Sequence, residues 1–406
     1  MTTATLEQAN QHRCRSSQHA QPALRGRDLL CFSHDWTGDP LSKTHLMRLL
    51  ARENRVLWVN SIGYRAPSAS RRDLSRAFQK LAAAVRPLRE VERNIFVLNP
   101  LVLPAYGSAA VRAFNRRFLG TQVRRAMRQL RYQRPINWVF NPAAALIAGD
   151  LNEERLIYYC VDEYTAFNGV PVASLVEMER KLIERADLVI ASSERLYLSK
   201  RQHNRRTHLV RHGVDFDHFR TALDPRTKVP AEISVLPKPV IGYFGLLAEE
   251  WVDLELLVRV AKRFANASLV LLGKSTMDLA PLRALPNVHL LGRKPYGTLP
   301  AYAKGFDVAL IPFPKNEATL HSNPLKAREY LAAGLPVVST AVPEVEVLGQ
   351  CRIGRNHDEF LAQIEAALAD LGPRNQRSDT VRSESWAARL AEVNEHLLPL
   401  LDRGGR

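Results

Sequence analysis

The chain has 406 residues, of which 46% are hydrophobic and 24% are charged. This composition excludes a disordered or fibrous protein, and no stretch approaches the roughly 20 consecutive apolar residues of a membrane-spanning helix. The net charge is +16, and residues 1–220 carry nearly all of the excess, with 35 basic and 20 acidic residues. Such an uneven charge predicts an anionic partner on one face of the molecule.

The first half of the chain alternates predicted strands with predicted helices. Residues 1–26 are polar and patternless, and we expect a disordered extension there. Apolar runs then predict buried strands at 29–33, 55–60, 136–140, 156–160, 187–191 and 207–211. Amphipathic stretches predict helices at 41–52, 172–185 and 193–202. This alternation is typical of a parallel sheet that is covered on both faces.

A proline-rich segment, 222–238, interrupts the pattern and predicts a linker. A second series of predicted strands follows at 240–244, 268–272, 288–291, 307–311 and 336–339. Further helical patterns cover 251–265, 324–333, 357–370 and, within the C-terminal segment 384–406, residues 384–401. We therefore predict an α/β fold of two Rossmann-like domains, 27–221 and 239–383, that face each other across a cleft. Ligands of such sheets bind at the carboxyl ends of the strands.

A basic insertion, residues 71–134, carries 15 basic and three acidic residues. Apolar residues recur at alternating spacings of four and three along 74–88, and a similar stripe follows along 109–130. One interpretation is a core-facing stripe beneath a solvated basic face. The other is a peripheral contact with an anionic membrane leaflet, where basic amphipathic helices lie in the interface.

The most informative segment is residues 321–340, HSNPLKAREYLAAGLPVVST. Its proline suits the first turn of a helix and its glycine suits the position after the end. The predicted helix start comprises Ser322, Asn323, Pro324 and Leu325. Unpaired N–H groups and the positive end of the helix dipole predict a diphosphate site here. Lys326 would oppose the dipole unless an anion were bound, and Glu329 lies within reach of a nucleotide's ribose.

The run Pro324–Val338 resembles the GT-B glycosyltransferases with a group 1 type C-terminal domain. The resemblance implies that Glu329 holds the ribose hydroxyls of a nucleotide-sugar and that the helix start holds its diphosphate. His321 stands where many retaining members have a second glutamate. Gly245 follows a strand where the family brings backbone close to phosphate. The family's usual Arg and Lys in the next loop are absent, so Lys326, with either Lys274 or Arg293, would supply the positive charge.

Within this group the chain is most similar in pattern to bacterial exopolysaccharide and teichuronic acid biosynthesis glycosyltransferases. By that resemblance Asp162, at the carboxyl end of a predicted strand, would take the proton from the acceptor hydroxyl, with Glu163 as its competitor. The loop after the first strand holds His34, Asp35 and Gly38, which would lie near the acceptor and the phosphates.

The resemblance implies a metal-independent enzyme without a cofactor, which uses a UDP- or GDP-linked sugar and a lipid-linked or polysaccharide acceptor. The wide spacing of the four cysteines fits a reducing cytoplasm. We expect a cytoplasmic protein, with peripheral attachment to the inner face of the cell membrane as the variant. Alternatives are a nucleotide-sugar epimerase and a non-catalytic GT-B-like binding protein. A nucleic-acid-binding protein is suggested only by the isoelectric point of about 10.0, because helix-turn-helix, zinc and RNP signatures are missing.

Overall fold

The apolar runs of the first half form an eight-stranded sheet in the computed structural model, which describes residues 24–62, 88–103 and 106–402. The spatial order is β3-β4-β2-β1-β5-β6-β7-β8, and every neighbouring pair except β3–β4 is parallel. The strands are β1 (Asp28–Phe32), β2 (Arg55–Val59), β3 (Arg89–Glu92), β4 (Ile95–Leu98), β5 (Ile136–Val139), β6 (Arg155–Cys160), β7 (Leu188–Ala191) and β8 (Thr207–Leu209). In the sheet centre, Cys31 lies between Trp58 and Trp138, and all three are fully buried. Central strands are apolar throughout because helices cover both faces.

The second half forms a six-stranded parallel sheet with the order β11-β10-β9-β12-β13-β14. The strands are β9 (Val240–Phe244), β10 (Ser268–Leu272), β11 (Val288–Gly292), β12 (Val308–Ile311), β13 (Val337–Thr340) and β14 (Arg352–Gly354). Gly242 of β9 lies at the centre, where a Cβ atom would come within 2.1 Å of the Phe306 ring. A side chain at this position would therefore displace the helical layer from the sheet.

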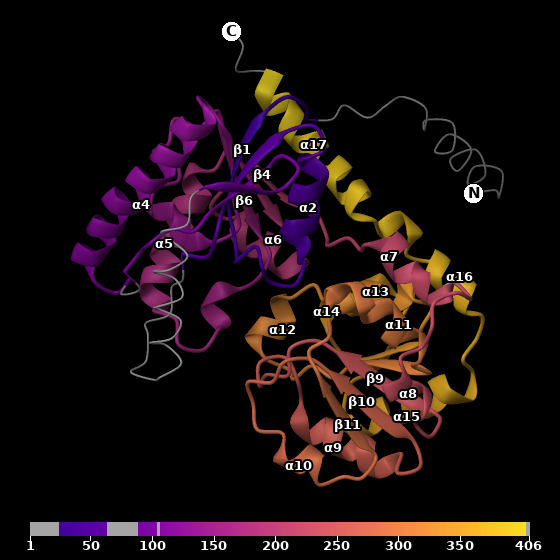
Figure 1. The fold of residues 1–406 in the computed structure, drawn as a ribbon. Coiled ribbons are helices and arrows are strands. Elements are labelled where there is room, and N and C mark those ends of the chain that lie inside the picture. Colours follow the sequence, from indigo (N-terminus) through magenta and orange to yellow (C-terminus); the bar gives the residue numbers. More distant parts are fainter. Residues whose placement is uncertain (1–23, 63–87, 104–105, 403–406) are drawn as a thin grey trace, which may run out of the picture.

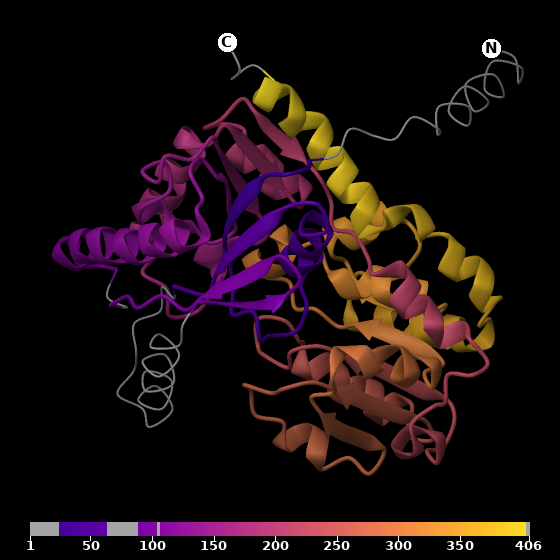
Figure 2. The same ribbon diagram turned by 45° about the horizontal axis from the view of Figure 1, so that its top comes forward.

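Helices cover the two sheets (Figures 1 and 2). Those of the first half are α2 (Ser42–Leu50), α4 (Ala109–Leu130), α5 (Val172–Arg185), α6 (Glu194–Lys200) and α7 (Phe216–Arg220). Those of the second half are α8 (Ala231–Ser234), α9 (Leu254–Arg263), α10 (Ala280–Arg283), α11 (Leu299–Lys304), α12 (Glu317–His321), α13 (Leu325–Ala332), α14 (Pro343–Leu348), α15 (His357–Ala369), α16 (Arg374–Asp379) and α17 (Trp386–Asp402). None of the described helices has the length and apolar character that crossing a membrane requires.

The last helix, α17, leaves the second domain and packs on the first (Figure 1). Its residues Val393, Leu397 and Leu401 are buried in the core of the first domain. An isolated β-bridge between Val214 and Ser385 joins the two segments of the chain that pass from one domain to the other. The sequence did not place this helix, whereas the structure makes it a second covalent and packed connection between the domains.

Each sheet has one point where the strand order reverses, and these points determine where a ligand can bind. In the first sheet, β2 lies on one side of β1 and β5 lies on the other side. In the second sheet, β10 lies on one side of β9 and β12 lies on the other side. At such a switch point the loops at the carboxyl ends diverge and leave a crevice. Two crevices that face each other can together hold a ligand larger than either crevice alone.

The fold class is confirmed: the chain is an α/β protein with two parallel, helix-covered sheets. The short strands β3, β4 and β14 were not predicted. Part of the predicted extension, residues 24–26, is described, and Leu24 is buried. The predicted stripe along 74–88 lies almost entirely outside the described residues. The predicted linker contains the short helix α8.

Candidate active site

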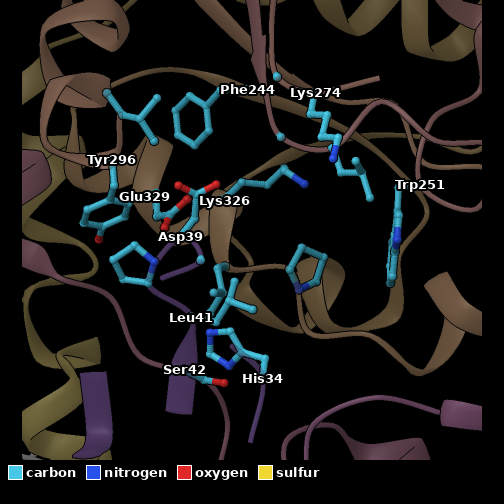
Figure 3. A pocket seen from close by; sticks show the side chains of 18 of the residues that line it. His34, Asp39, Leu41, Ser42, Phe244, Trp251, Lys274, Tyr296, Lys326 and Glu329 are labelled. Carbon is cyan, nitrogen blue, oxygen red and sulfur yellow. The ribbon is translucent and has the colours of Figure 1, made fainter. Parts of the chain in front are cut away.

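A cavity of about 740 Å³ lies between the two domains, at the carboxyl ends of the strands of both sheets. Segments that follow β1 and β6 line it from the first domain, and segments that follow β9, β10 and β12 line it from the second. Figure 3 shows His34, Leu41 and Ser42 on one wall and Phe244, Lys274 and Lys326 on the other. Both switch points therefore open into one space, of a size that suits a small-molecule ligand.

Helix α13 points its start into this cavity, as the sequence predicted. Pro324 precedes the helix and has no side-chain capping bond, and Gly334 follows its end with φ of +77°. Proline has the backbone angle that a helix start requires, while glycine tolerates the left-handed angle at the end. Leu325, Lys326 and Glu329 all line the cavity. The free amides of the first turn and the dipole of the helix therefore favour an anion at this wall.

Lys326 and Glu329 are half-buried and carry shifted pKa values. Burial lowers the pKa of Lys326 to about 8, against the opposing effect of Glu329. Burial also raises the pKa of Glu329 to about 7, an effect that Lys326 reduces. The Lys326 ammonium lies over the rings of Phe313 and Tyr243, 4.8 and 5.2 Å from their centroids. The two side chains are therefore held in a poorly hydrated environment, where an added anion would interact strongly with the lysine.

Two glycines form the floor of the cavity beneath Lys326. Gly245 has φ of +148°, and a Cβ atom there would lie 3.0 Å from the Lys326 ammonium and 2.8 Å from the Tyr243 hydroxyl. Gly273 has φ of +153°, and its Cβ would lie 1.7 Å from the Gly245 carbonyl oxygen. The prediction for Gly245 named the place where backbone can approach a phosphate. Gly273 was not predicted, although it follows the adjacent strand β10 in the same way.

Ser322 and Asn323 line the cavity, but their side chains already have hydrogen-bond partners within the protein. The Asn323 side-chain amide donates to the Ser192 carbonyl at 2.7 Å, and its oxygen accepts from Arg328 at 2.8 Å. The Ser322 hydroxyl donates to the Thr319 carbonyl at 2.9 Å. These two residues can therefore contribute backbone groups to a ligand, while the Asn323 side chain fixes the position of α13 against the first domain.

Of the two carboxylates proposed as the base, the structure brings Asp162 into the cavity. It follows β6 and lines the cavity with Val161. Burial raises the pKa of Asp162, Lys43 lowers it, and Glu163 adds a smaller upward effect. A carboxylate with a raised pKa that faces a ligand cavity is suited to accept a proton.

Glu163 is instead part of a buried polar network behind the cavity wall. Its carboxylate lies 3.2 Å from the Lys200 ammonium and accepts from the Thr165 hydroxyl at 2.5 Å. Burial raises its pKa, but Lys200 and the Thr165 hydrogen bonds outweigh this effect and hold the pKa below its usual range. Glu163 also caps the turn η2 (Tyr164–Ala166). These contacts give it a structural role and do not bring it to the cavity.

The loop after β1 brings His34, Asp35 and Gly38 to the cavity, as expected. Burial and the nearby Lys43 lower the pKa of His34 to about 3, so this imidazole is neutral at physiological pH. The Asp35 carboxylate accepts from the Ser61 amide at 3.0 Å and thereby shapes the loop. Both His34 and Asp35 thus have local partners on their own domain.

Arg293 was predicted to bind the donor, and it lines the cavity from the loop after β11. Its guanidinium forms two hydrogen bonds with the Asp39 carboxylate of the opposite domain, at 2.6 and 3.1 Å. This exposed ion pair crosses the edge of the cavity. Lys274, the alternative source of positive charge, also lines the cavity (Figure 3).

Three further residues were missed as candidates. Lys43 lies in the first turn of α2 and lines the cavity, in the same position relative to its helix as a lysine in α13. His212 also lines the cavity, and its Nε2 atom is buried without a hydrogen-bond partner. Trp251 forms an aromatic wall, with its ring 5.6 Å from that of Phe313. A lysine directly after a predicted helix start was a signal that could have identified Lys43.

The described residues contain no group of three or more His, Cys, Asp or Glu side chains that could hold a metal ion. One Asp-x-Asp sequence occurs, at Asp215–Asp217, where the chain enters α7. Neither aspartate lines the cavity. Asp217 is exposed, and Asp215 lies 4.0 Å from His45.

Comparisons with known proteins agree with this geometry. Residues 238–370 match the family model described as "Glycosyl transferases group 1". The chain is 24% identical over 291 residues to TuaH of Bacillus subtilis (strain 168), which is described as a teichuronic acid biosynthesis glycosyltransferase; the match covers 64% of this chain and 70% of TuaH.

Two solved structures illustrate the likeness of fold. Sucrose-phosphate synthase from Thermosynechococcus elongatus is 16% identical, with a TM-score of 0.67 over 93% of this chain and 100% of that chain. HepE of Anabaena, in complex with UDP, is 14% identical, with a TM-score of 0.62 over 92% of this chain and 100% of that chain. Residues 238–370 thus form a group 1 glycosyltransferase domain in a chain with the GT-B fold. On these grounds the chain has the GT-B fold, and its second domain is similar to the group 1 glycosyltransferases.

Proposed function

We propose that this protein transfers a sugar from a UDP- or GDP-linked donor to a lipid-linked or polysaccharide acceptor, without a divalent metal, in bacterial surface-polysaccharide synthesis. The observation that carries the proposal is the meeting of two walls in one cavity. Lys326 and Glu329 face it from the second domain, and Asp162 faces it from the first. The similarity to TuaH supports the polysaccharide context.

The donor would bind to the second domain. The start of α13 and the Lys326 ammonium would hold the diphosphate, and the Glu329 carboxylate would accept hydrogen bonds from the ribose hydroxyls. Gly245 and Gly273 leave room for the phosphates to approach the backbone. As the bond between the sugar and the diphosphate breaks, negative charge grows on the leaving oxygen. The fixed positive charge at this wall would stabilise the negative charge on the leaving oxygen. A bound metal ion makes the same contribution in metal-dependent enzymes.

The acceptor would enter from the first domain. Asp162 would take the proton of the acceptor hydroxyl while the acceptor oxygen bonds to the anomeric carbon of the sugar. The bond from that carbon to the diphosphate breaks in the same step, and the nucleoside diphosphate leaves with the electron pair. A base on the opposite wall from the leaving group corresponds to a single displacement.

Helix α4 supports peripheral attachment to an anionic membrane, although its apolar residues are divided between two faces. Leu119, Val123 and Met127 are buried in the first domain. Phe114 is 50% and Phe118 38% exposed, and their rings stack 5.4 Å apart. Exposed arginines share the face with these rings, at Arg117, Arg125 and Arg128. An aromatic pair beside several arginines suits the interface of an anionic leaflet.

Donor binding can be tested by thermal shift with UDP-, GDP- and TDP-sugars, followed by calorimetry with the nucleotide that stabilises most. We expect one nucleotide class to bind the wild type, and Glu329→Ala and Lys326→Met to bind it weakly. Glu395→Ala and Lys262→Met, which replace exposed residues, serve as matched controls. Turnover of donor without any acceptor would favour an epimerase, and loss of transfer in EDTA that added metal restores would contradict metal independence.

Membrane attachment needs a separate experiment. The purified protein should sediment with vesicles that contain phosphatidylglycerol and should remain in solution with phosphatidylcholine vesicles. Replacement of Phe114 and Phe118 by serine, or of Arg117 and Arg125 by glutamate, should release it without affecting nucleotide binding. Equal binding of wild type and variants would assign the attachment to another part of the chain and contradict the role of α4.

A further inference from the structure

A second helix start faces the cavity from the first domain. Ser42 and Lys43 form the first turn of α2, and both line the cavity. Figure 3 shows Ser42 on the opposite wall of the cavity from Lys326. The residue before α2 is Leu41, which offers no side-chain capping bond. The first amides of α2 therefore have no acceptor from a cap, and the positive end of its dipole points toward the cavity.

The two polar side chains of this turn are buried and lack local partners. Ser42 is 3% exposed and Lys43 9% exposed. Within the part of the chain that the structure describes, neither side chain has a hydrogen-bond or ion-pair partner. A buried ammonium is costly unless an opposite charge compensates it. Burial lowers the pKa of Lys43, and the carboxylate of Asp162 opposes this effect without forming an ion pair with the lysine.

The starts of α2 and α13 line the cavity from different domains. The carboxylate that favours the charged form of Lys43 is Asp162, which belongs to the first domain. The carboxylate that favours the charged form of Lys326 is Glu329, in the second domain. Two lysines, each at a helix start, therefore offer positive charge at two positions in the cavity.

We propose that the start of α2, with the Ser42 hydroxyl and the Lys43 ammonium, binds an anionic group of the acceptor, either a phosphate or a carboxylate. This inference rests on the proposed transfer reaction. The acceptor, and not the donor, is assigned here because Lys43 lines the cavity from the first domain together with Asp162, the group that would receive the acceptor's proton. A substrate held at Lys43 thus presents its hydroxyl near the base, while the donor diphosphate occupies the start of α13.

The subsite can be tested by binding alone, with inorganic phosphate and glucuronate as probes. The protein is first saturated with UDP or GDP, and each anion is then titrated by calorimetry or by NMR. We expect at least one anion to bind the wild type and to bind Lys43→Met about ten- to a hundredfold more weakly, the loss typical of a charge-assisted hydrogen bond. Lys43→Arg should retain binding. Asp162→Asn should strengthen it, because a competing negative charge is removed.

Failure of this inference is distinct from failure of the proposed function. If neither nucleotide binds, the proposed function fails, and titration of phosphate into Lys326→Met still tests the α2 site. If Lys43→Met weakens nucleotide binding and leaves phosphate binding unchanged, Lys43 belongs to the donor site and the inference is wrong. Equal anion binding by Lys43→Met and wild type would also overturn it. Lys262→Met, which removes an exposed lysine, is the matched control.

Kinetics separate acceptor recognition from a general effect on Asp162. Three acceptors that differ only in charge are compared: an octyl glucoside, an octyl glucuronide and an octyl glucosyl phosphate. Lys43→Met should raise the KM of the preferred anionic acceptor about ten- to a hundredfold and leave the KM of the neutral glucoside unchanged. The preference between carboxylate and phosphate identifies the source of the anion. An equal effect on all three acceptors, with a shifted pH profile of kcat, would assign Lys43 to the base alone and overturn the inference.

Discussion

His212 Nδ1 donates a hydrogen bond to the Asn323 carbonyl oxygen across 2.9 Å and thereby joins the end of the first domain to the start of α13. A carbonyl can only accept, so Nδ1 carries the proton and Nε2 has a free lone pair. Burial lowers the pKa of His212 to about 3, and the ring remains neutral. The position of α13 therefore depends on a residue 111 positions earlier in the chain.

Replacement of His212 by leucine should loosen this connection. The Asn323 carbonyl would remain buried and lose the hydrogen bond that His212 donates, which typically costs about 1–3 kcal/mol. We expect a lower free energy of unfolding in denaturant titrations and weaker nucleotide binding by calorimetry. His212→Asn can keep the hydrogen bond through its amide and should bind nucleotide more tightly than the leucine variant. Identical stability of wild type and His212→Leu would contradict the role assigned to this bond.

Glu329→Gln should stabilise the ligand-free protein at high pH and weaken donor binding. Burial raises the pKa of Glu329 to about 7, above the ordinary value of 4.5. Its contribution to stability is therefore present below pH 4.5 and is lost as the pH rises through 7. The melting temperature of the variant should match the wild type at pH 4 and exceed it at pH 8. Nucleotide affinity should fall about ten- to a hundredfold.

The same thermal comparison with Glu395→Gln provides the control, since this glutamate is exposed. A variant at position 329 that is no more stable than the wild type at pH 8 would show that the carboxylate is well solvated. Unchanged nucleotide affinity would remove Glu329 from the donor site.

The lowered pKa of Lys326 predicts that the affinity for a nucleoside diphosphate decreases at alkaline pH. Burial lowers its pKa to about 8, so the ligand-free ammonium loses its charge above that pH. The dissociation constant of the bound nucleoside diphosphate, measured from pH 7 to 9.5, should rise above pH 8. Lys326→Arg should remove this dependence because arginine stays charged, whereas Lys326→Met should bind weakly throughout. A flat profile for the wild type would be inconsistent with a lysine that contacts the diphosphate.

Asp162→Asn should slow turnover without affecting donor binding. The amide keeps the size of the side chain and cannot accept the proton, and a general base typically contributes 10²–10⁴-fold to the rate. We expect kcat to fall by about that factor, with the nucleotide dissociation constant within twofold of wild type, roughly the resolution of calorimetry. Asp217→Asn is the control at an exposed position.

Glu163→Gln distinguishes the two adjacent carboxylates. Because Glu163 pairs with Lys200 inside the first domain, its loss should lower stability and leave the rate of folded enzyme nearly intact. If Glu163→Gln instead reduced kcat as strongly as expected for Asp162→Asn, the assignment of the base would have to be reversed.

Gly273→Ala should disrupt the floor of the proposed donor site. The new methyl group would lie 1.7 Å from the Gly245 carbonyl oxygen, and the φ of +153° disfavours any side chain. We expect a destabilised protein with little nucleotide binding, measured by melting temperature and calorimetry. Gly297→Ala, where a Cβ atom would meet nothing within 4 Å, should behave as wild type. Normal binding by Gly273→Ala would mean that the floor can move to accommodate the methyl group.

The sequence by itself determined the two-sheet architecture and helix α13, whose start lines the cavity. Buried strands and amphipathic helices leave a local pattern, since their side chains repeat every two or 3.6 residues. Pro324, Glu329 and Gly334 all lie within eleven positions, so the α13 segment carries its own start, ligand-facing residue and end. The resemblance to GT-B glycosyltransferases rested mainly on this short segment, so it required no knowledge of contacts between residues far apart in the chain.

Tertiary structure decided the roles that depend on residues far apart in the chain. Asp162 and Glu163 are neighbours in sequence. The Glu163 carboxylate pairs with Lys200 inside the first domain, whereas Asp162 faces the cavity. Lys43 became a candidate because folding brought it near Asp162 and left its ammonium without a close partner. The physical reason is that burial and charge pairing arise between elements that meet only after folding, whereas propensity and periodicity act along a few consecutive residues.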